Sequence, residues 1–338
     1  MYDIRPSKIY VHADILKAPA YRARVDRVVA ALREPVDPTP FTDEDIPGMV
    51  RDGLLDKRVA MQGLDPVEDP ILLFNLFRFD NRLAERLETM HAAGIDDDWN
   101  LRRVLGYDSF HWANYNLPGD PHRHDKVCRP CWRIHQQNGC LHRCTYCGLG
   151  GLLISSVNIE EFCEQLGRLI ERHPWQKTYL LDDDGDPPCL EPEHGVLGKL
   201  IEFFGTLDDR YLIVHTKTWN TAWLRELQHN GNTIFVWSIS GPTQSRLIEP
   251  KTGTTDQRIL AARFAQEAGY QIRYKFKPIV PVRNWRKDAA YAVAKLFEMT
   301  DPDVISLCVW MWHDVDEMKQ RLPVDLLDPD CLKAAEDS

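Results

Sequence analysis

Three closely spaced cysteines are the residues of this chain with the most distinctive chemistry. Cys140, Cys144 and Cys147 follow a C-x3-C-x2-C pattern, and Tyr146 stands directly before the third thiol. Three thiolates in one loop can hold three corners of a four-iron four-sulfur cluster and leave the fourth iron without a protein ligand. A small molecule could then bind that iron and react there. The alternatives are a zinc knuckle, which would normally need a fourth close ligand, and chance clustering.

A second set of possible metal ligands lies just before this loop. His122, His124, Cys128 and Cys131 could form a separate tetrahedral zinc site, because two histidines and a C-x2-C pair suit that ion. The alternative is a basic surface loop whose thiols are buried as small residues.

The composition indicates a globular protein from a reducing compartment. The chain has 338 residues, of which 43% are apolar, enough for one large domain or two smaller ones. It has no run of about 18 apolar residues and no secretion-type N-terminus. Nine cysteines, five of them between residues 128 and 147, suit metal binding or catalysis better than disulfides. We therefore expect a cytoplasmic protein without a membrane-spanning segment.

Apolar, β-prone runs alternate with segments of helical spacing in the second half of the chain. The helical segments include residues 158–172 and a helix that begins at Thr255 as its N-cap and stops at Gly269. About six such strand–helix units predict an α/β fold, with a parallel sheet and loops gathered at the carboxyl ends of the strands. The predicted strands are residues 132–137, 177–184, 210–217, 232–240, 270–280 and 303–312.

The residues before this series are harder to interpret. Tyr10–Leu32 suggests a strand and a helix, and Ile71–Ala93 suggests a longer amphipathic helix. We predict three regions: an N-terminal, largely helical extension or cap over residues 1–126, the main domain over 127–315 and a tail over 316–338.

Polar side chains stand where two of the predicted strands end. His215, Thr216 and Lys217 finish one strand, and Ser238 and Ser240 finish the next. Buried strands rarely carry polar groups without partners, so these residues could bind a carboxylate and ribose hydroxyls. Ordinary loop caps are the alternative.

The cysteine loop resembles the signature of the radical S-adenosylmethionine superfamily, C-x3-C-x-aromatic-C, which reads CLHRCTYC here. The resemblance implies a partial, TIM-like (β/α)6 barrel that holds a four-iron four-sulfur cluster on the three cysteines and S-adenosylmethionine on the open iron. One electron from an external donor such as flavodoxin would yield a 5′-deoxyadenosyl radical. Gly185 and Asp186 resemble the Gly-Glu-Pro-like element that binds the methionine ammonium in this superfamily.

Within the superfamily, the chain is similar to the spore photoproduct lyases, which repair a thymine dimer in DNA. The similarity covers roughly residues 128–312 and includes the segments NGCLHRCTYC, HTK, FVWSIS and EPKTGTTDQRILAA. By this match Lys217 and Ser238 would contact S-adenosylmethionine, and Tyr146 and Ser240 are further candidates for the cofactor site. The implied function is a lyase- or isomerase-type reaction that abstracts hydrogen from a thymine-derived base in DNA. It would serve lesion repair or the rearrangement of a hypermodified thymine.

One departure from the lyases concerns the return of hydrogen to the product. The lyases use a cysteine at the end of the second strand, where this chain has Asp183. Cys189 and then Tyr274 are our candidates for that role. Two other hypotheses stay open: a radical enzyme that tailors a small metabolite or peptide, and a non-catalytic, zinc-containing nucleic-acid-binding protein.

Local charge must decide whether DNA is a feasible partner, because the net charge of the chain is −10. Residues 272–287 contain six cations and no acid, and on a strand Arg273, Lys275 and Lys277 would share one face that could follow phosphates. A solvated outer face balanced by acids is the alternative. A second group of cations around the cysteine loop comprises Arg123, Lys126, Arg129, Arg133 and Arg143. The aromatic residues Tyr107, Phe110, His111, Trp112 and Tyr115 could stack on a flipped base or pack the extension onto the barrel.

Overall fold

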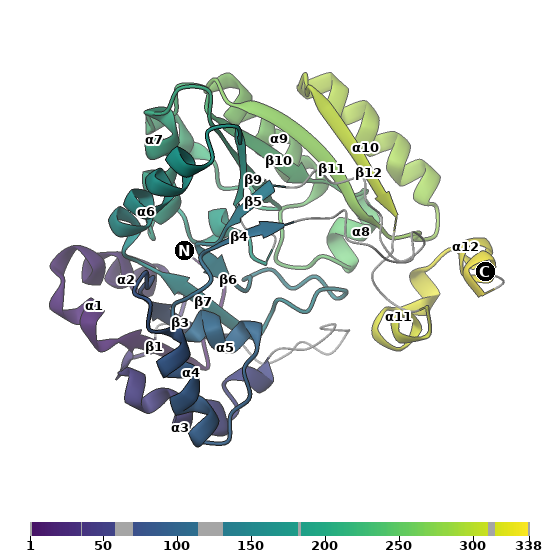
Figure 1. The fold of residues 1–338 in the computed structure, drawn as a ribbon. Coiled ribbons are helices and arrows are strands. Elements are labelled where there is room, and N and C mark those ends of the chain that lie inside the picture. The colour runs from purple at the N-terminus through teal and green to yellow at the C-terminus, as the bar shows by residue number, and fades with distance from the viewer. Residues whose placement is uncertain are drawn as a thin grey trace.

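Two sheets built mainly from parallel strands organise the fold (Figure 1). The computed structural model describes residues 2–34, 36–57, 70–113, 131–181, 184–309 and 315–336. Within these residues, the larger sheet has seven strands in the order β12-β11-β10-β9-β8-β5-β4. They are β4 (Phe110–Ala113), β5 (Cys131–Ile134), β8 (Thr178–Leu181), β9 (Tyr211–Thr216), β10 (Thr233–Ser238), β11 (Gln271–Ile279) and β12 (Val304–Val309).

Six of these strands coincide with the six runs that the sequence predicted. Every neighbouring pair from β5 to β12 is parallel, whereas β4 joins the edge of β5 in antiparallel orientation. The predicted α/β fold with a series of parallel strands is confirmed.

Helices cover the outer face of this sheet. Phe162 of α6 (Ile159–Arg172) and Phe204 of α7 (Val196–Gly205) pack in one core with strand residues such as Trp237 and Tyr274. Strand residues of the other parity, among them Lys275, face the inner side of the sheet. The other outer helices are α8 (Pro242–Leu247), α9 (Thr255–Glu267) and α10 (Trp285–Met299). Among the described residues, no helix is both long and apolar enough to cross a bilayer.

The caps of α9 agree closely with the sequence. Thr254 is the N-cap, one residue before the predicted Thr255, and its side chain and that of Gln257 form a capping box. Gly269, at φ +94°, follows the end of the helix as predicted.

The smaller sheet joins the N-terminal region to the segments on either side of the cysteine loop. Its order is β2-β1-β3-β7-β6, and β6 and β7 come from the main α/β region. Its strands are β1 (Lys8–His12), β2 (Thr39–Phe41), β3 (Ile71–Asn75), β6 (Gln137–Asn138) and β7 (Leu152–Ser156). The N-terminal helices are α1 (Ala13–Lys17), α2 (Pro19–Ala31), α3 (Ile46–Arg51), α4 (Leu83–Ala92) and α5 (Trp99–Val104). The extension is thus rich in helix, but its strands bind it to the rest of the chain.

The prediction of one helix over Ile71–Ala93 was wrong. Its first five residues form β3, which lies between β1 and β7 with every residue buried, and α4 begins only at Leu83. A run of four apolar residues carries no periodicity that separates a buried strand from a helix, so only the neighbouring strands decide. The boundaries drawn at residues 126 and 315 stay predictions.

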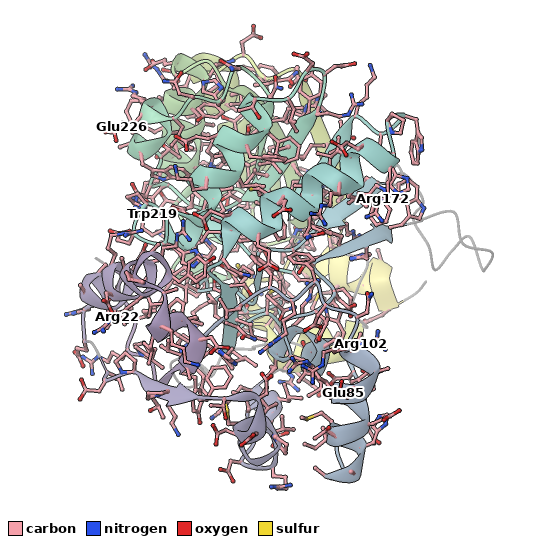
Figure 2. The ribbon with its side chains drawn as sticks, turned by 60° about the vertical axis from the view of Figure 1, so that its left-hand side comes forward. Arg22, Glu85, Arg102, Arg172, Trp219 and Glu226 are labelled. Atoms are coloured by element: carbon pink, nitrogen blue, oxygen red, sulfur yellow. The ribbon has the colours of Figure 1, made fainter. Side chains whose placement is uncertain are left out.

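Short helical segments complete the described structure. They are η1 (Asp43–Asp45), η2 (Leu55–Lys57), η3 (Pro187–Leu190), η4 (Ala222–Glu226), α11 (Val315–Arg321), η5 (Val324–Leu326) and α12 (Pro329–Glu336). Figure 2 shows charged side chains such as Arg22 and Glu226 on the outside of the N-terminal and main regions, respectively.

Gly139 connects the two sheets immediately before the first cysteine of the loop. Its N–H donates to the carbonyl oxygen of Asp184 at 2.7 Å, and it forms a bridge with Gly185 beyond the end of β8. Its φ is +106°, and a Cβ placed there would lie 2.2 Å from the carbonyl oxygen of Leu152. Only glycine allows this close approach, which places the cysteine loop at the carboxyl end of β8.

Replacement of Gly139 by alanine should therefore destabilise the fold by at least about 3 kcal/mol, because the new methyl group meets backbone atoms. Gly94→Ala is a matched control, since Gly94 also has a positive φ, +77°, but has open space around its Cβ position. We expect the control to lose only about 1 kcal/mol. Urea unfolding followed by circular dichroism measures both values, and equal losses would contradict this account of Gly139.

Candidate active site

The cysteine loop is held against the segment that follows α8. The N–H of Arg143 donates to the carbonyl oxygen of Pro250 at 3.0 Å, and the N–H of Thr145 donates to that of Ile248 at 2.9 Å. The imidazole of His142 also contacts the carbonyl oxygen of Lys251, at 2.7 Å. The loop therefore rests on the connection between β10 and α9.

The three thiols of this loop fit an iron–sulfur cluster by their chemistry. Cys140, Cys144 and Cys147 form no disulfides among the described residues, and Cys144 is only 5% exposed. Two of the sulfurs face N–H groups: the backbone N–H of His142 lies 3.4 Å from Cys140 Sγ, and Lys217 Nζ lies 3.6 Å from Cys144 Sγ. Such contacts stabilise the negative charge of thiolate-bound iron.

Burial keeps Cys140 and Cys144 protonated in the absence of metal. It raises the pKa of Cys140 well above the usual value and that of Cys144 to about 11, although Lys217 opposes the shift at Cys144. Bound iron must therefore displace protons, which couples cluster assembly to pH.

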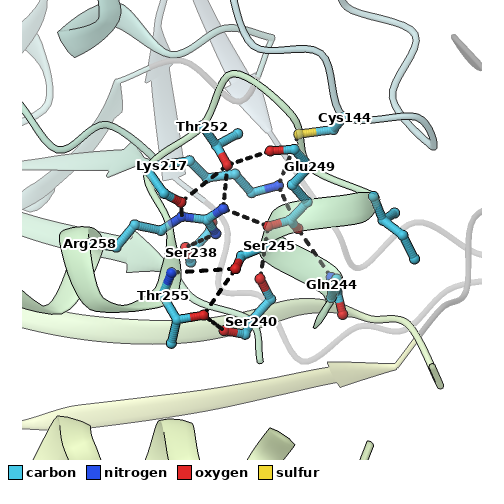
Figure 3. Close-up of polar contacts among 12 residues, drawn as sticks. Cys144, Lys217, Ser238, Ser240, Gln244, Ser245, Glu249, Thr252, Thr255 and Arg258 are labelled. Carbon is cyan, nitrogen blue, oxygen red and sulfur yellow. Dashed lines mark hydrogen bonds and ion pairs between the residues drawn. The ribbon is translucent and has the colours of Figure 1, made fainter. Parts of the chain in front are cut away.

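A buried carboxylate, Glu249, connects the cysteine loop to the ends of two strands (Figure 3). Glu249 is 1% exposed and pairs with Arg258 of α9, which is fully buried, at 2.7 Å. Although burial favours the neutral acid, Lys217 and Arg258 hold the pKa of Glu249 far below its usual range. Further partners of the carboxylate are Tyr146 Oη (2.6 Å), Ser240 Oγ (2.8 Å), Gln244 Nε2 (3.1 Å) and Lys217 Nζ (3.3 Å).

Arg258 has a hydrogen-bond partner at every side-chain nitrogen. It donates from Nη1 to the carbonyl oxygen of Ser238 at 3.0 Å, from Nε to that of Gly253 and from Nη2 to Thr252 as well as to Glu249. A buried ion pair is tolerated when its remaining donors are satisfied in this way. The pair fixes the end of β10 relative to α9 and the cysteine loop.

Lys217 brings a positive charge from the end of β9 to the cysteine loop. Its ammonium group contacts the Tyr146 hydroxyl and lies 4.8 Å from the centre of the Tyr146 ring. Burial opposes the charge, but Cys144 and Glu249 outweigh it and raise the pKa of Lys217. Lys217 therefore stays cationic beside the proposed metal ligands.

Asp186 holds the loop against the same strand end. Its carboxylate accepts hydrogen bonds from Thr216 Oγ1 and from the backbone N–H of Lys217, both at 2.7 Å, and lies 3.0 Å from His142 Nε2. Three of the roughly four acceptor positions of a carboxylate are thus used within the protein. One position remains for a ligand such as an ammonium group, so the role predicted for Asp186 stays a prediction.

The structure gathers most of the predicted site residues at the carboxyl ends of β8, β9 and β10. Gly185, Asp186, Lys217, Ser238 and Ser240 lie at these strand ends, and Tyr146 meets them from the cysteine loop. Their contacts with S-adenosylmethionine remain predictions.

The two predicted hydrogen-transfer residues differ in location. Cys189 is buried in a second apolar cluster with Leu141 of the cysteine loop, and its Sγ lies 3.8 Å from Gln137 Nε2, which also donates to the carbonyl oxygen of Gly139. Tyr274 faces the outer helices instead, and its hydroxyl contacts Thr300 Oγ1 at 3.2 Å. The structure therefore brings Cys189, but not Tyr274, to the cysteine loop.

Several other predictions lie partly or wholly outside the described residues. Of the predicted zinc ligands, only Cys131 is described, at the start of β5. The other three predicted zinc ligands, His122, His124 and Cys128, lie outside the described residues. So do the aromatic candidate Tyr115, the residue Asp183 that replaces the lyase cysteine, and the cations Arg123, Lys126 and Arg129.

The predicted cationic strand face exists, but it lies on the inner side of the sheet. Arg273, Lys275 and Lys277 alternate with the buried residues of β11, and Arg273 pairs with Asp303 at 3.0 Å. Burial and the charges of Lys275, Lys277 and Arg133 lower the pKa of His215 on β9, which places these groups on a common wall. The face is therefore not the solvated outer face of the alternative interpretation, and its contact with a DNA backbone stays a prediction.

The predicted aromatic group is divided between different surroundings. Phe110 stacks on Phe79 and contacts Phe162 of α6, so it packs the extension onto the barrel helices. Tyr107 is buried in the N-terminal core. Trp112 is 38% exposed beside Trp132, and His111 contacts His135. The described aromatic residues therefore agree better with packing of the extension onto the barrel than with one surface on which a flipped base could stack.

Comparisons with known proteins give the family. The model of the spore photoproduct lyase family, described as "Spore photoproduct lyase", matches residues 130–307. The chain belongs to this family. It is 30% identical to the spore photoproduct lyase of Bacillus subtilis over 173 residues, which cover 49% of this chain and 51% of that protein. The enzyme of Clostridium acetobutylicum is 28% identical over 172 residues, 48% of this chain and 51% of the relative. The chain thus aligns with about half the length of these relatives.

Solved structures of spore photoproduct lyase share the fold. A mutant with bound AdoMet and dinucleoside spore photoproduct superposes with a TM-score of 0.61 at 20% identity, over 91% of this chain and 79% of that chain. Another structure, complexed with dinucleoside spore photoproduct, superposes with a TM-score of 0.61 at 20% identity. That superposition covers 90% of this chain and 78% of the other chain. The superposition covers nine tenths of this chain, so the likeness in fold extends beyond the residues that the family model matches.

The buried pair predicts a large difference between two arginines of α9. Arg258→Met leaves Glu249 without its fully buried partner and should destabilise the protein by roughly 3 to 5 kcal/mol. Arg263→Met is the matched control, because Arg263 pairs with Glu267 on the same helix but is 47% exposed. The control should change stability by less than about 0.5 kcal/mol. Unfolding in guanidinium chloride measures the stability of both variants. A small effect for Arg258→Met would contradict a central role for the pair of Arg258 and Glu249.

Proposed function

We propose that this chain is a radical S-adenosylmethionine enzyme of lyase or isomerase type that acts on a thymine-derived base in DNA. The main support is the meeting of Cys144, Tyr146 and Lys217, which come from a three-cysteine loop and from the end of a parallel strand. Family membership supports the same chemistry, and the lyase structures that share the fold bind AdoMet and dinucleoside spore photoproduct.

Cys140, Cys144 and Cys147 would hold a four-iron four-sulfur cluster in this proposal. With S-adenosylmethionine bound, the cluster supplies the electron that yields a 5′-deoxyadenosyl radical. A separate zinc ion forms no part of the proposal, because three of its four predicted ligands lie outside the described residues.

The residues around the loop have separate tasks. Lys217 donates toward Cys144 Sγ and offsets negative charge there. Glu249 fixes Tyr146 and Ser240, and Asp186 fixes the backbone of Lys217, so the strand ends and the loop keep one geometry. Gly185, Ser238 and the remaining acceptor position of Asp186 would then meet the cofactor.

Water is kept from one side of the loop by the C-terminal segment. Met318, Leu322 and Leu327 are buried in the same apolar cluster as Cys144 and Tyr146. Excluding water protects a radical from side reactions and strengthens the electrostatic contacts at the site. An external one-electron donor such as flavodoxin, in a reducing cytoplasm, would supply the electrons.

The substrate would be a damaged or modified thymine, for repair or for rearrangement. Cys189 remains the candidate for hydrogen return, since burial raises its pKa far above the usual value and keeps it as the S–H form that can give up a hydrogen atom. Incubation with oligonucleotides deuterated in the thymine-derived nucleotide tests the substrate. Deuterium in the 5′-deoxyadenosine supports the proposal, and 5′-deoxyadenosine formed without any label contradicts a thymine-derived substrate.

The cluster itself is tested by Cys144→Ala. We expect this variant, reconstituted without oxygen, to lose most of its iron and sulfide and all cleavage of S-adenosylmethionine, because two thiolates do not hold the cluster. Cys163→Ala is the control, since Cys163 lies on α6 and packs against the main core. Metal analysis and chromatography of 5′-deoxyadenosine give the two values. Zinc without iron in the unmodified protein would end the proposal.

A further inference from the structure

Exposed cations gather on two neighbouring segments beside the cysteine loop. Arg246 of α8 and Lys251 lie on the segment after β10, and Arg283, Arg286 and Lys287 lie on the segment after β11. The structure leaves all five exposed. We call these five residues the basic rim. It stands out in a chain whose net charge is −10.

Only two acids lie within the same two segments, against five cations. Glu249 is buried and already paired with Arg258 and Lys217. Asp288 is half-buried and accepts a hydrogen bond from the N–H of Thr243 at 2.8 Å. The exposed Asp325 and Asp330 belong to the C-terminal segment that pairs with Val282 and comes close to Arg286 at Cys331, so they offset part of the charge of the rim.

The two segments form one surface at the mouth of the barrel. Gln244 of α8 donates from Nε2 to the carbonyl oxygen of Pro278 at 2.9 Å, and its Oε1 accepts from the N–H of Val280 at 3.1 Å. Both segments also touch the cysteine loop, because Ile248, Val280 and Val282 pack in the same apolar cluster as Cys144. The rim therefore borders the place where a base would have to enter.

The position of three rim residues is unfavourable for the stability of α10. Arg283, Arg286 and Lys287 surround the first turn of this 15-residue helix, whose N-cap, Asn284, makes no side-chain cap hydrogen bond. The N-terminus of a helix carries partial positive charge, so cations there oppose the helix dipole. Residues that destabilise the helix on which they lie are expected at binding sites. Because these residues are cations at a helix N-terminus, the ligand that they would bind is an anion.

We propose that the basic rim binds the phosphate backbone of DNA and so presents a base to the cysteine loop. This inference rests on the proposed function and names its contact surface. Exposed cations on two neighbouring segments suit a row of phosphates, which arginine can bind in bidentate fashion. An acidic protein that donates electrons is the competing occupant of such a surface.

The test compares two triple variants that change the net charge equally. Arg246→Gln, Arg286→Gln and Lys287→Gln remove three rim cations, whereas Lys199→Gln, Arg225→Gln and Arg263→Gln remove three exposed cations of α7, η4 and α9. Affinity for an undamaged DNA duplex is measured by fluorescence anisotropy over a range of KCl concentrations, with the reconstituted protein. Affinity falls as salt rises, by a slope of about 0.9 in log affinity per log salt for each phosphate bound. The rim variant should make this slope shallower by up to about 3, because it binds fewer phosphates. The control variant should leave the slope unchanged.

Thermal unfolding of the same proteins separates binding from folding. The rim variant should be at least as stable as the unmodified protein, because two of its changes relieve the first turn of α10. Equal salt slopes for the two variants would overturn the inference. The inference would also be overturned if the rim variant kept its DNA affinity but was reduced more slowly by flavodoxin, while its rate of reduction by dithionite stayed unchanged.

The proposed function can fail separately from this inference. Formation of 5′-deoxyadenosine without DNA reports on the cofactor chemistry alone, whereas the salt slope reports on the rim alone. Loss of the first with a normal salt slope removes the radical reaction and leaves the DNA surface in place.

Discussion

The buried charge of Glu249 is the interaction on which the geometry of the site depends. One carboxylate receives Arg258 from α9, Lys217 from the end of β9, Ser240 from beyond β10 and Tyr146 from the cysteine loop. An ionised group in this position would be strongly destabilising without those partners, so each of them is held in place by the need to satisfy it. The result is that residues more than 100 positions apart in sequence meet around Cys144 with little freedom.

A second attachment places the loop at the correct edge of the sheet. Gly139 leaves the smaller sheet and contacts Asp184 and Gly185 at the end of β8, and Asp186 then contacts His142 and the end of β9. The smaller sheet is therefore part of the site's support, since β6 and β7 carry the two ends of the loop. This explains why the N-terminal region cannot be regarded as a detachable cap: β3 pairs along its whole length with β7.

Local patterns in the sequence predicted the barrel well and its internal contacts poorly. The six parallel strands and the caps of α9 follow from alternation, β-branched runs and turn residues, which act over a few positions. The helix prediction for Ile71–Asn75 failed because the burial of this segment depends on β1 and β7, which lie far away in the chain. Glu249 and Arg258 lie within a segment that matched the family, yet nothing in their neighbourhood indicates that they pair. The one available signal was Arg258 on the apolar side of α9, beside Ile259 and Ala262. Tyr274 was a poor candidate for hydrogen transfer by the same local pattern, because strand parity places it on the face of β11 opposite Lys275, toward the outer helices.

Burial divides the cations of this chain into two kinds that a charge count treats alike. Lys217 and Arg258 are enclosed, and their charge is used to hold Glu249 and the cysteine loop, so it has no influence on a distant anion. Arg246, Arg286 and Lys287 are exposed, and two of them stand where the helix dipole disfavours them. Because the first kind is satisfied within the protein, only the second can act on a partner in solution. A protein with net charge −10 can therefore still offer a positive surface at the one edge where its chemistry is placed.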